Sequence, residues 1–158
     1  MLRSFATKAL RVKLFVKSKV SRAGTYFITA VANGRRRTFH TEQDALLLIE
    51  TLQLYRREGK YLLHAFVVMP DHLHILITPK SATMERSVGL IKGGFSYRLQ
   101  SKMPVWQDGY DDHRCRDVDE FISRREYIHM NPVRAGIVAE PHLFRFSSAY
   151  RQEQAPGG

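Results

Sequence analysis

Two histidines stand two positions apart in a short apolar run of this chain. His72 and His74 lie in the segment from Val67 to Pro79, which reads VVMPDHLHILITP. Residues i and i+2 of a β-strand point to the same face, so the two imidazole groups are expected side by side. Neighbouring imidazole groups are typical metal ligands. A His-x-His pair alone is more often structural or exposed, but a strand that spends two same-face positions on imidazole is more easily explained by a ligand.

A second group of polar residues follows about fifty residues later, in the segment YIHMNPVRAG. Tyr127 and Asn131 are four positions apart and would share one face of a helix. Each has an ordinary explanation, because Tyr127 could be half-buried packing and Asn131 could end a helix before Pro132. Together with the histidine pair, in a basic chain, they suggest metal-assisted attack of a tyrosine on a nucleic-acid phosphate.

The positive charge is concentrated at the N-terminus. The formal net charge is +10, and residues 1–41 hold ten Lys and Arg residues and no acidic residue. Such a field attracts phosphate polyanions in a salt-dependent way. Two other interpretations stay open for the first residues, a solvated arm that aids solubility and a targeting peptide.

The remaining patterns predict one domain with a mixed fold. We expect strands at 25–32, 61–69, 72–78 and 110–116 and helices at 42–58, 81–102 and 118–130, the last ended or bent by Asn131-Pro132. This order, β-α-β-β-α-β-α, predicts a ferredoxin-like α+β fold, an antiparallel sheet with helices on one face. The two hairpin strands are expected near the sheet centre. No apolar run approaches the ~20 residues that span a bilayer, and the single cysteine, Cys115, allows no internal disulfide.

The two segments resemble the single-tyrosine transposase family of HUH endonucleases, in which a hydrophobic residue separates two histidines. Further segments are similar to its branch of REP-associated tyrosine transposases: GTYF at 24–27, IKGGFS at 91–96, VWQ at 105–107, DHR at 112–114 and FSSAY at 146–150. The resemblance covers 22–150, which we take as the domain, with a basic extension at 1–21 and a disordered tail at 151–158.

The resemblance implies a role for each residue of the two segments. His72 and His74 would hold a divalent metal ion, Mg or Mn, with Asn131 as third ligand, although related enzymes often carry glutamine there. Tyr127 would be the nucleophile that cleaves single-stranded or hairpin DNA through a 5′-phosphotyrosine. The side chains expected to contact DNA are Arg35, Arg36, Arg37, Lys92, Arg98, Trp106, Arg114, Arg116 and Arg134.

The remaining expectations concern partners and location. We expect no membrane association and a bacterial cytoplasmic, nucleoid-associated enzyme. Both a monomer and a homodimer with shared active sites are compatible with the sequence. The main alternative is a domesticated DNA-binding protein without catalysis. A histidine-dependent phosphohydrolase fits less well, because Leu76 stands where histidine-triad hydrolases carry a third alternating histidine.

Overall fold

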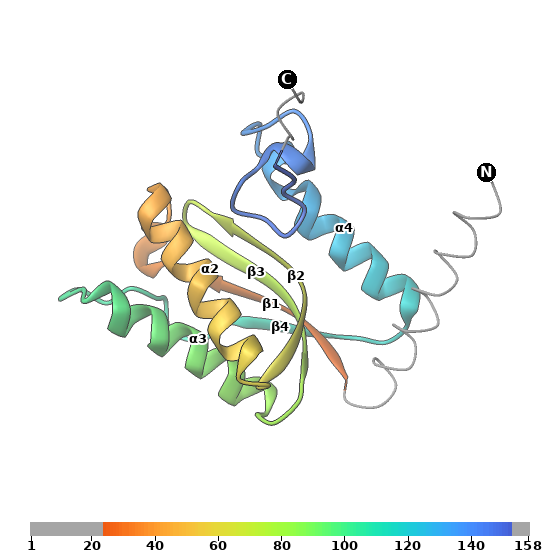
Figure 1. Cartoon of the computed structure of the whole chain (residues 1–158), viewed down its shortest axis with the longest axis horizontal. Helices are drawn as coiled ribbons and strands as arrows, with labels where there is room; N and C mark the ends of the chain where they lie inside the picture. Colours follow the sequence, from red (N-terminus) through yellow and green to blue (C-terminus); the bar gives the residue numbers. More distant parts are fainter. Residues whose placement is uncertain (1–23, 153–158) are drawn as a thin grey trace, which may run out of the picture.

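The computed structural model describes residues 24–152, which form a four-stranded antiparallel sheet with helices on both faces (Figure 1). The strands are β1 (Thr25–Val31), β2 (Tyr61–Met69), β3 (His72–Pro79) and β4 (Asp111–Cys115), and the helices are α2 (Glu42–Arg57), α3 (Met84–Leu99) and α4 (Val118–Arg134). Short 3-10 turns lie at Asn33–Arg35 and Pro141–Leu143. The order of elements confirms the predicted α+β class. The predicted basic extension at 1–21 and most of the predicted tail lie outside the described residues.

Each α-helix begins at a residue whose side chain caps it. The side-chain oxygens of Thr41, Thr83 and Asp117 accept hydrogen bonds from the backbone N–H three residues later. Such a cap satisfies one of the N–H groups that a helix start leaves unpaired. The starts of α2 and α4 lie at the predicted positions, 42 and 118.

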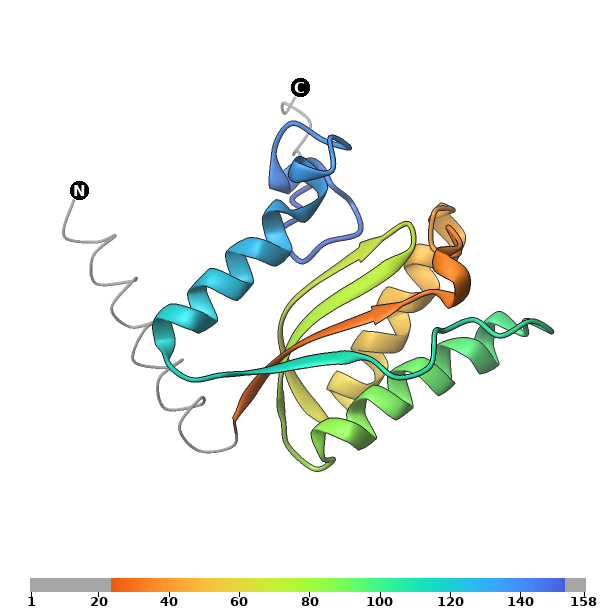
Figure 2. The same ribbon diagram turned by 180° about the vertical axis from the view of Figure 1, so that it is seen from behind.

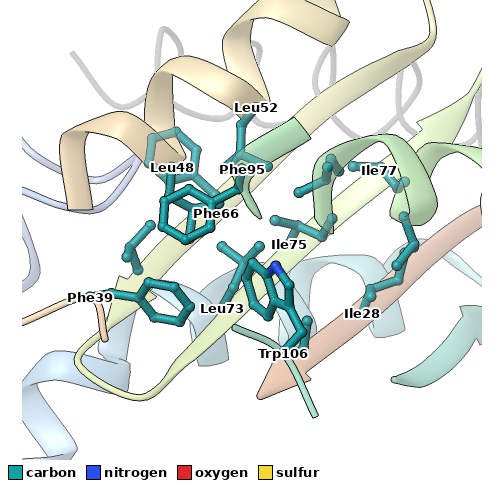
Figure 3. Packing of buried hydrophobic residues seen from close by; sticks show 14 of the residues in the cluster. Ile28, Phe39, Leu48, Leu52, Phe66, Leu73, Ile75, Ile77, Phe95 and Trp106 are labelled. Carbon is teal, nitrogen blue, oxygen red and sulfur yellow. The ribbon is translucent and has the colours of Figure 1, made fainter. Parts of the chain in front are cut away.

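The first face of the sheet packs against α2 and α3. Leu73, Ile75 and Ile77 of β3 are each at most 2% exposed and belong to this core. Leu48 and Leu52 of α2 pack in the same cluster, which Figure 3 shows from close by. The helices α2 and α3 thus cover one face of the sheet, as the predicted fold requires.

The third helix, α4, packs on the opposite face, as Figures 1 and 2 show. Phe121 and Ile128 of α4 are buried with Phe27 of β1, Val67 of β2 and Leu76 of β3. The predicted fold class is thus confirmed, with α2 and α3 as the helices on one face, and α4 covers the other face. The physical reason is that the central strands carry apolar side chains on both faces, so both need a cover.

The strand order is β2-β3-β1-β4, so β3 is central but β2 is an edge strand. The expectation that both hairpin strands are central was therefore wrong for β2. The C-terminal segment covers its free edge: the Val68 N–H donates to the Phe146 carbonyl at 2.8 Å, and the Ser148 N–H donates to the Phe66 carbonyl at 3.0 Å. These bonds satisfy backbone groups that an open edge would leave unpaired.

The helix α4 was expected to end or bend at Asn131-Pro132, but it continues through Pro132 to Arg134. Proline removes only one intrahelical N–H, and the turn that follows caps a carbonyl group at the end of the helix. The Ile137 N–H donates to the Pro132 carbonyl at 2.9 Å. Tyr127 and Asn131 therefore lie on one unbroken helix. Among residues 24–152, no helix is long and apolar enough to cross a membrane.

Candidate active site

The histidine pair projects from β3 toward α4. Pairing with β1 places Thr29 opposite His74 and Val31 opposite His72. The two imidazole rings lie side by side, with centroids 4.6 Å apart. His74 is buried, at 6% exposed, whereas His72 is partly exposed. The side-by-side placement expected from strand alternation is what the structure has.

A second residue orients each ring through its Nδ1 atom. Nδ1 of His72 lies 2.7 Å from Oδ1 of Asp71, and Nδ1 of His74 lies 2.8 Å from Oγ1 of Thr29. A carboxylate only accepts hydrogen bonds, so the Nδ1 atom of His72 carries the proton. Nε2 is then the atom left to bind a metal. Metal-binding histidines commonly have such outer partners, which fix the tautomer and the ring orientation.

The protonation state of His74 suits a metal ligand. Burial, and then the positive charge of a protonated His72, lowers the pKa of His74 to about 3. Burial disfavours the charged form of imidazole because it removes water from the ring. His74 is therefore neutral at physiological pH, and a neutral imidazole offers a lone pair to a cation.

Tyr127 of α4 lies beside this pair. Its ring centroid is 5.5 Å from that of His74 and 5.8 Å from that of Phe27, and Phe27 in turn stacks on His74 at 5.3 Å. The Tyr127 residue is 37% exposed, so its phenol is open to a large substrate. The structure thus brings together a phenol and an imidazole pair that are remote in sequence, and one chain supplies both.

The two histidines alone supply too few ligands for a divalent ion, so a third protein ligand such as the Asn131 amide is needed. Among residues 24–152, no group of three or more His, Cys, Asp or Glu side chains is placed to hold a metal. Asn131 lies one helical turn beyond Tyr127 on α4 and is partly buried. No contact between its side chain and either histidine is present in this part of the chain. An Asn oxygen with two imidazoles and water is a suitable shell for Mg or Mn.

Two arginines of α4 flank the tyrosine. The guanidinium carbon of Arg134 lies 5.1 Å from the ring centroid of Tyr127. The guanidinium carbon of Arg124 lies 4.9 Å from the ring centroid of Phe27. Sequence reasoning missed Arg124, although its position three residues before Tyr127 places it on the same side of a helix.

Sequence reasoning also missed Thr29, Asp71 and Phe27. Asp71 directly precedes His72 and could have been recognised as an orienting carboxylate from that adjacency. Thr29 and Phe27 gave no comparable signal, because their contacts with His74 depend on the pairing of β1 with β3.

Two of the predicted DNA contacts have structural roles. Trp106 is only 9% exposed, and its indole N–H donates to the Lys92 carbonyl at 3.0 Å. The Lys92 ammonium group donates to the carbonyls of Gln107 and Gly109, and burial lowers its pKa. Figure 3 shows Trp106 among the side chains between the sheet and its helices. The indole is thus part of the core, and this burial argues for a structural role of Trp106 over the predicted DNA contact.

The other predicted basic residues lie at several places. Arg35, Arg36 and Arg37 are exposed after β1, and Nη1 of Arg35 lies 3.7 Å from Oδ2 of Asp71. Arg98 is exposed on α3, across the sheet from the histidines. Two more lie at β4: Arg114 packs over Gly24, and Nε of Arg116 donates to Glu120 at 3.3 Å. Of these residues, Arg35 is the one that a contact places near the histidine pair, through Asp71.

A sheet that carries a His-x-His pair against a helical tyrosine defines the class of single-tyrosine HUH proteins. Comparison with known families agrees, since residues 21–131 match the family described as "Transposase IS200 like". The chain belongs to this family, whose members are DNA-cleaving enzymes.

Within this family, the chain is similar to REP-associated tyrosine transposases. The chain is 27% identical over 132 residues to the REP-associated tyrosine transposase of Escherichia coli strain K12, covering 82% of this chain and 79% of the relative. A solved structure of a REP-associated tyrosine transposase bound to a REP hairpin matches with a TM-score of 0.71 and 27% identity, covering 80% of this chain and 76% of the other. A Deinococcus radiodurans protein, at 19% identity and a TM-score of 0.51 over 64% of this chain and 89% of its own, shares the fold.

Proposed function

We propose that this protein cleaves and rejoins one strand of single-stranded or hairpin DNA, with Tyr127 as nucleophile. The supporting observation is the contact between the Tyr127 ring and the His74 ring, at a centroid distance of 5.5 Å. A tyrosine beside a pair of imidazoles is the arrangement that metal-assisted transesterification needs. Hairpin DNA is the substrate class because a similar solved structure is of a transposase bound to a REP hairpin.

The reaction exchanges one phosphoester bond for another. The Tyr127 oxygen attacks the scissile phosphorus, the bond to the leaving 3′ oxygen breaks, and the phenol proton ends in solvent while the freed 3′ oxygen takes one up. The protein is then joined to the 5′ phosphate. A 3′-hydroxyl of the same or another strand can attack this phosphotyrosine and restore a phosphodiester without nucleotide energy.

We propose that His72, His74 and Asn131 hold the divalent ion, Mg or Mn. A metal bound there would polarise the phosphate and stabilise charge as the new bond forms. The chain's own contribution is orientation: Asp71 and Thr29 each hold one ring at its Nδ1 atom, and Nε2 would bind the ion. Arg134 is placed to bind a DNA phosphate beside Tyr127, and the exposed arginines at 35–37 would add sequence-independent affinity.

The test is a cleavage assay on hairpin oligonucleotides that copy palindromic repeats flanking the gene, with Mg or Mn present. Tyr127→Phe should abolish the denaturant-resistant protein–DNA adduct and leave hairpin binding nearly unchanged. His72→Ala should remove metal-dependent cleavage. An adduct that persists in Tyr127→Phe would refute the nucleophile, and wild-type binding without any adduct would favour a domesticated DNA-binding protein. We also propose that one chain suffices for cleavage, since it holds both the tyrosine and the histidines.

A further inference from the structure

Arg124 is held against the site by an aromatic ring rather than by an acid. Its guanidinium carbon lies 4.9 Å from the ring centroid of Phe27, the side chain that also contacts His74 and Tyr127. Phe27 is 8% exposed, so its ring is a fixed platform. A guanidinium on an aromatic face is attracted to the ring electrons and keeps its N–H groups free to donate at its edges.

Among the described residues, no acid is paired with Arg124. Its possible partner one turn earlier, Glu120, is bound by the backbone and side chain of Arg116 and by His113. Within residues 24–152, neither Arg124 nor Arg134 forms an ion pair. The donors of Arg124 therefore remain available for an anion from outside the chain.

The helix places these cations on one flank of α4. Phe121 and Ile128 mark the buried stripe that docks α4 on the sheet. At ~3.6 residues per turn, Arg124, Tyr127 and Arg134 fall on one side of this stripe, and Arg125 falls on the other. Arg125 is otherwise a close match to Arg124, since its guanidinium carbon lies 5.7 Å from the ring centroid of Phe121.

We propose that Arg124 is a phosphate-binding residue. It binds a DNA phosphate next to the one that Tyr127 attacks, and the Phe27 ring holds the Arg124 guanidinium in position. Arg124 and Arg134 would then hold the strand on both sides of the tyrosine. A planar guanidinium suits this task because two of its N–H groups can meet two phosphate oxygens at once. This inference rests on the proposed function only in taking DNA as the ligand. Arg124 can bind a DNA phosphate whether or not the strand is cleaved.

The experiment measures DNA binding by a variant that cannot form the covalent adduct. Tyr127→Phe protein, which keeps the ring, is titrated with a DNA hairpin that carries a single-stranded 5′ extension, across a series of salt concentrations. Adding Arg124→Gln should weaken binding about 10-fold and lower the slope of log K against log salt by about 0.7, the value for one single-strand phosphate contact. Adding Arg125→Gln, the matched control, should change the slope by much less.

A second measurement keeps the wild-type arginine and changes the DNA. Neutral methylphosphonate groups are placed one at a time along the extension, and binding to the same unreactive background is compared with and without Arg124→Gln. We expect one position at which the neutral group weakens binding only when Arg124 is present. Equal effects of Arg124→Gln and Arg125→Gln, or no position that depends on Arg124, would overturn the proposal. Failure of wild-type protein to form an adduct would overturn the proposed function instead and leave these binding results valid.

Discussion

The burial of Trp106 predicts that its loss costs stability and leaves the DNA contacts intact. Its ring centroid lies 5.0 Å from that of Phe39 and 5.8 Å from that of Phe95, and its indole N–H donates to the Lys92 carbonyl. Truncating a buried Trp to Ala costs about 3–5 kcal/mol through lost contacts and the cavity left behind. Since domains of this kind are stable by roughly 5–15 kcal/mol, Trp106→Ala should remove a large part of the free energy of unfolding.

The assay is urea unfolding, read by circular dichroism. With about 2 kcal/mol lost per molar urea, the midpoint of Trp106→Ala should fall by about 2 M. Trp106→Phe keeps most of the ring and should lose clearly less. Hairpin affinity, measured at low temperature where both variants are folded, should stay within about two-fold of wild type, because no base stacks on a buried ring.

The chain offers a further readout, since Trp106 is its single tryptophan. Its fluorescence should be protected from acrylamide and should not shift on titration with DNA. A stacking contact would behave in the opposite way, because losing one costs about 1–3 kcal/mol of binding per base. A small change in the urea midpoint together with a 10-fold or larger loss of affinity would refute the core assignment.

Three other changes test separate parts of the structure. Asp71→Asn should weaken Mn²⁺ binding about 10- to 100-fold in calorimetry without DNA, because His72 loses its orienting carboxylate; unchanged affinity would exclude that role. Gly93→Ala should raise the free energy of unfolding by up to about 1 kcal/mol, since nothing lies within 4 Å of its Cβ position. Gly94→Ala should raise the free energy of unfolding less or lower it, because its Cβ would lie 2.5 Å from the Tyr55 hydroxyl. Equal shifts in thermal midpoint would contradict this. Hydrogen bonds from the Arg116 backbone N–H, and then from His113, lower the pKa of Glu120 from 4.5 to about 2. The ionised Glu120 therefore stabilises the folded protein fully above pH 4.5, and this stabilisation is lost as the pH falls toward 2. Glu120→Gln should flatten that part of a curve of unfolding free energy against pH.

The elements that a single strand or helix determines could be predicted from the sequence. The side-by-side histidines follow from the two-residue period of a strand, and Tyr127 with Asn131 follows from helical spacing. The helix starts at Thr41 and Asp117 follow from capping chemistry. Each of these inferences needs only residues close together in the chain, which is why the structure agrees with them.

The features that sequence reasoning missed depend on contacts between distant segments. Trp106 sits in a loop among polar residues, and an aromatic in such a loop has the same sequence pattern whether it is buried or exposed. The face chosen by α4 depends on which side of the sheet still has uncovered apolar side chains, and β3 has them on both sides. The edge position of β2 depends on the pairing of β1 with β3, which no local pattern specifies.

The strand β1 shows most clearly how the fold makes the site. No residue of β1 was predicted to act in chemistry, because it reads as an ordinary run of aromatic and β-branched residues. Antiparallel pairing with β3 sets Thr29 opposite His74 and Phe27 opposite Leu76. Thr29 then orients the buried imidazole, and the ring of Phe27 contacts that imidazole and the ring of Tyr127 while it holds Arg124. A strand slip of one residue would turn all of these side chains to the other face, so the register of β1 on β3 determines the geometry of the active site as strongly as the histidines and the tyrosine do.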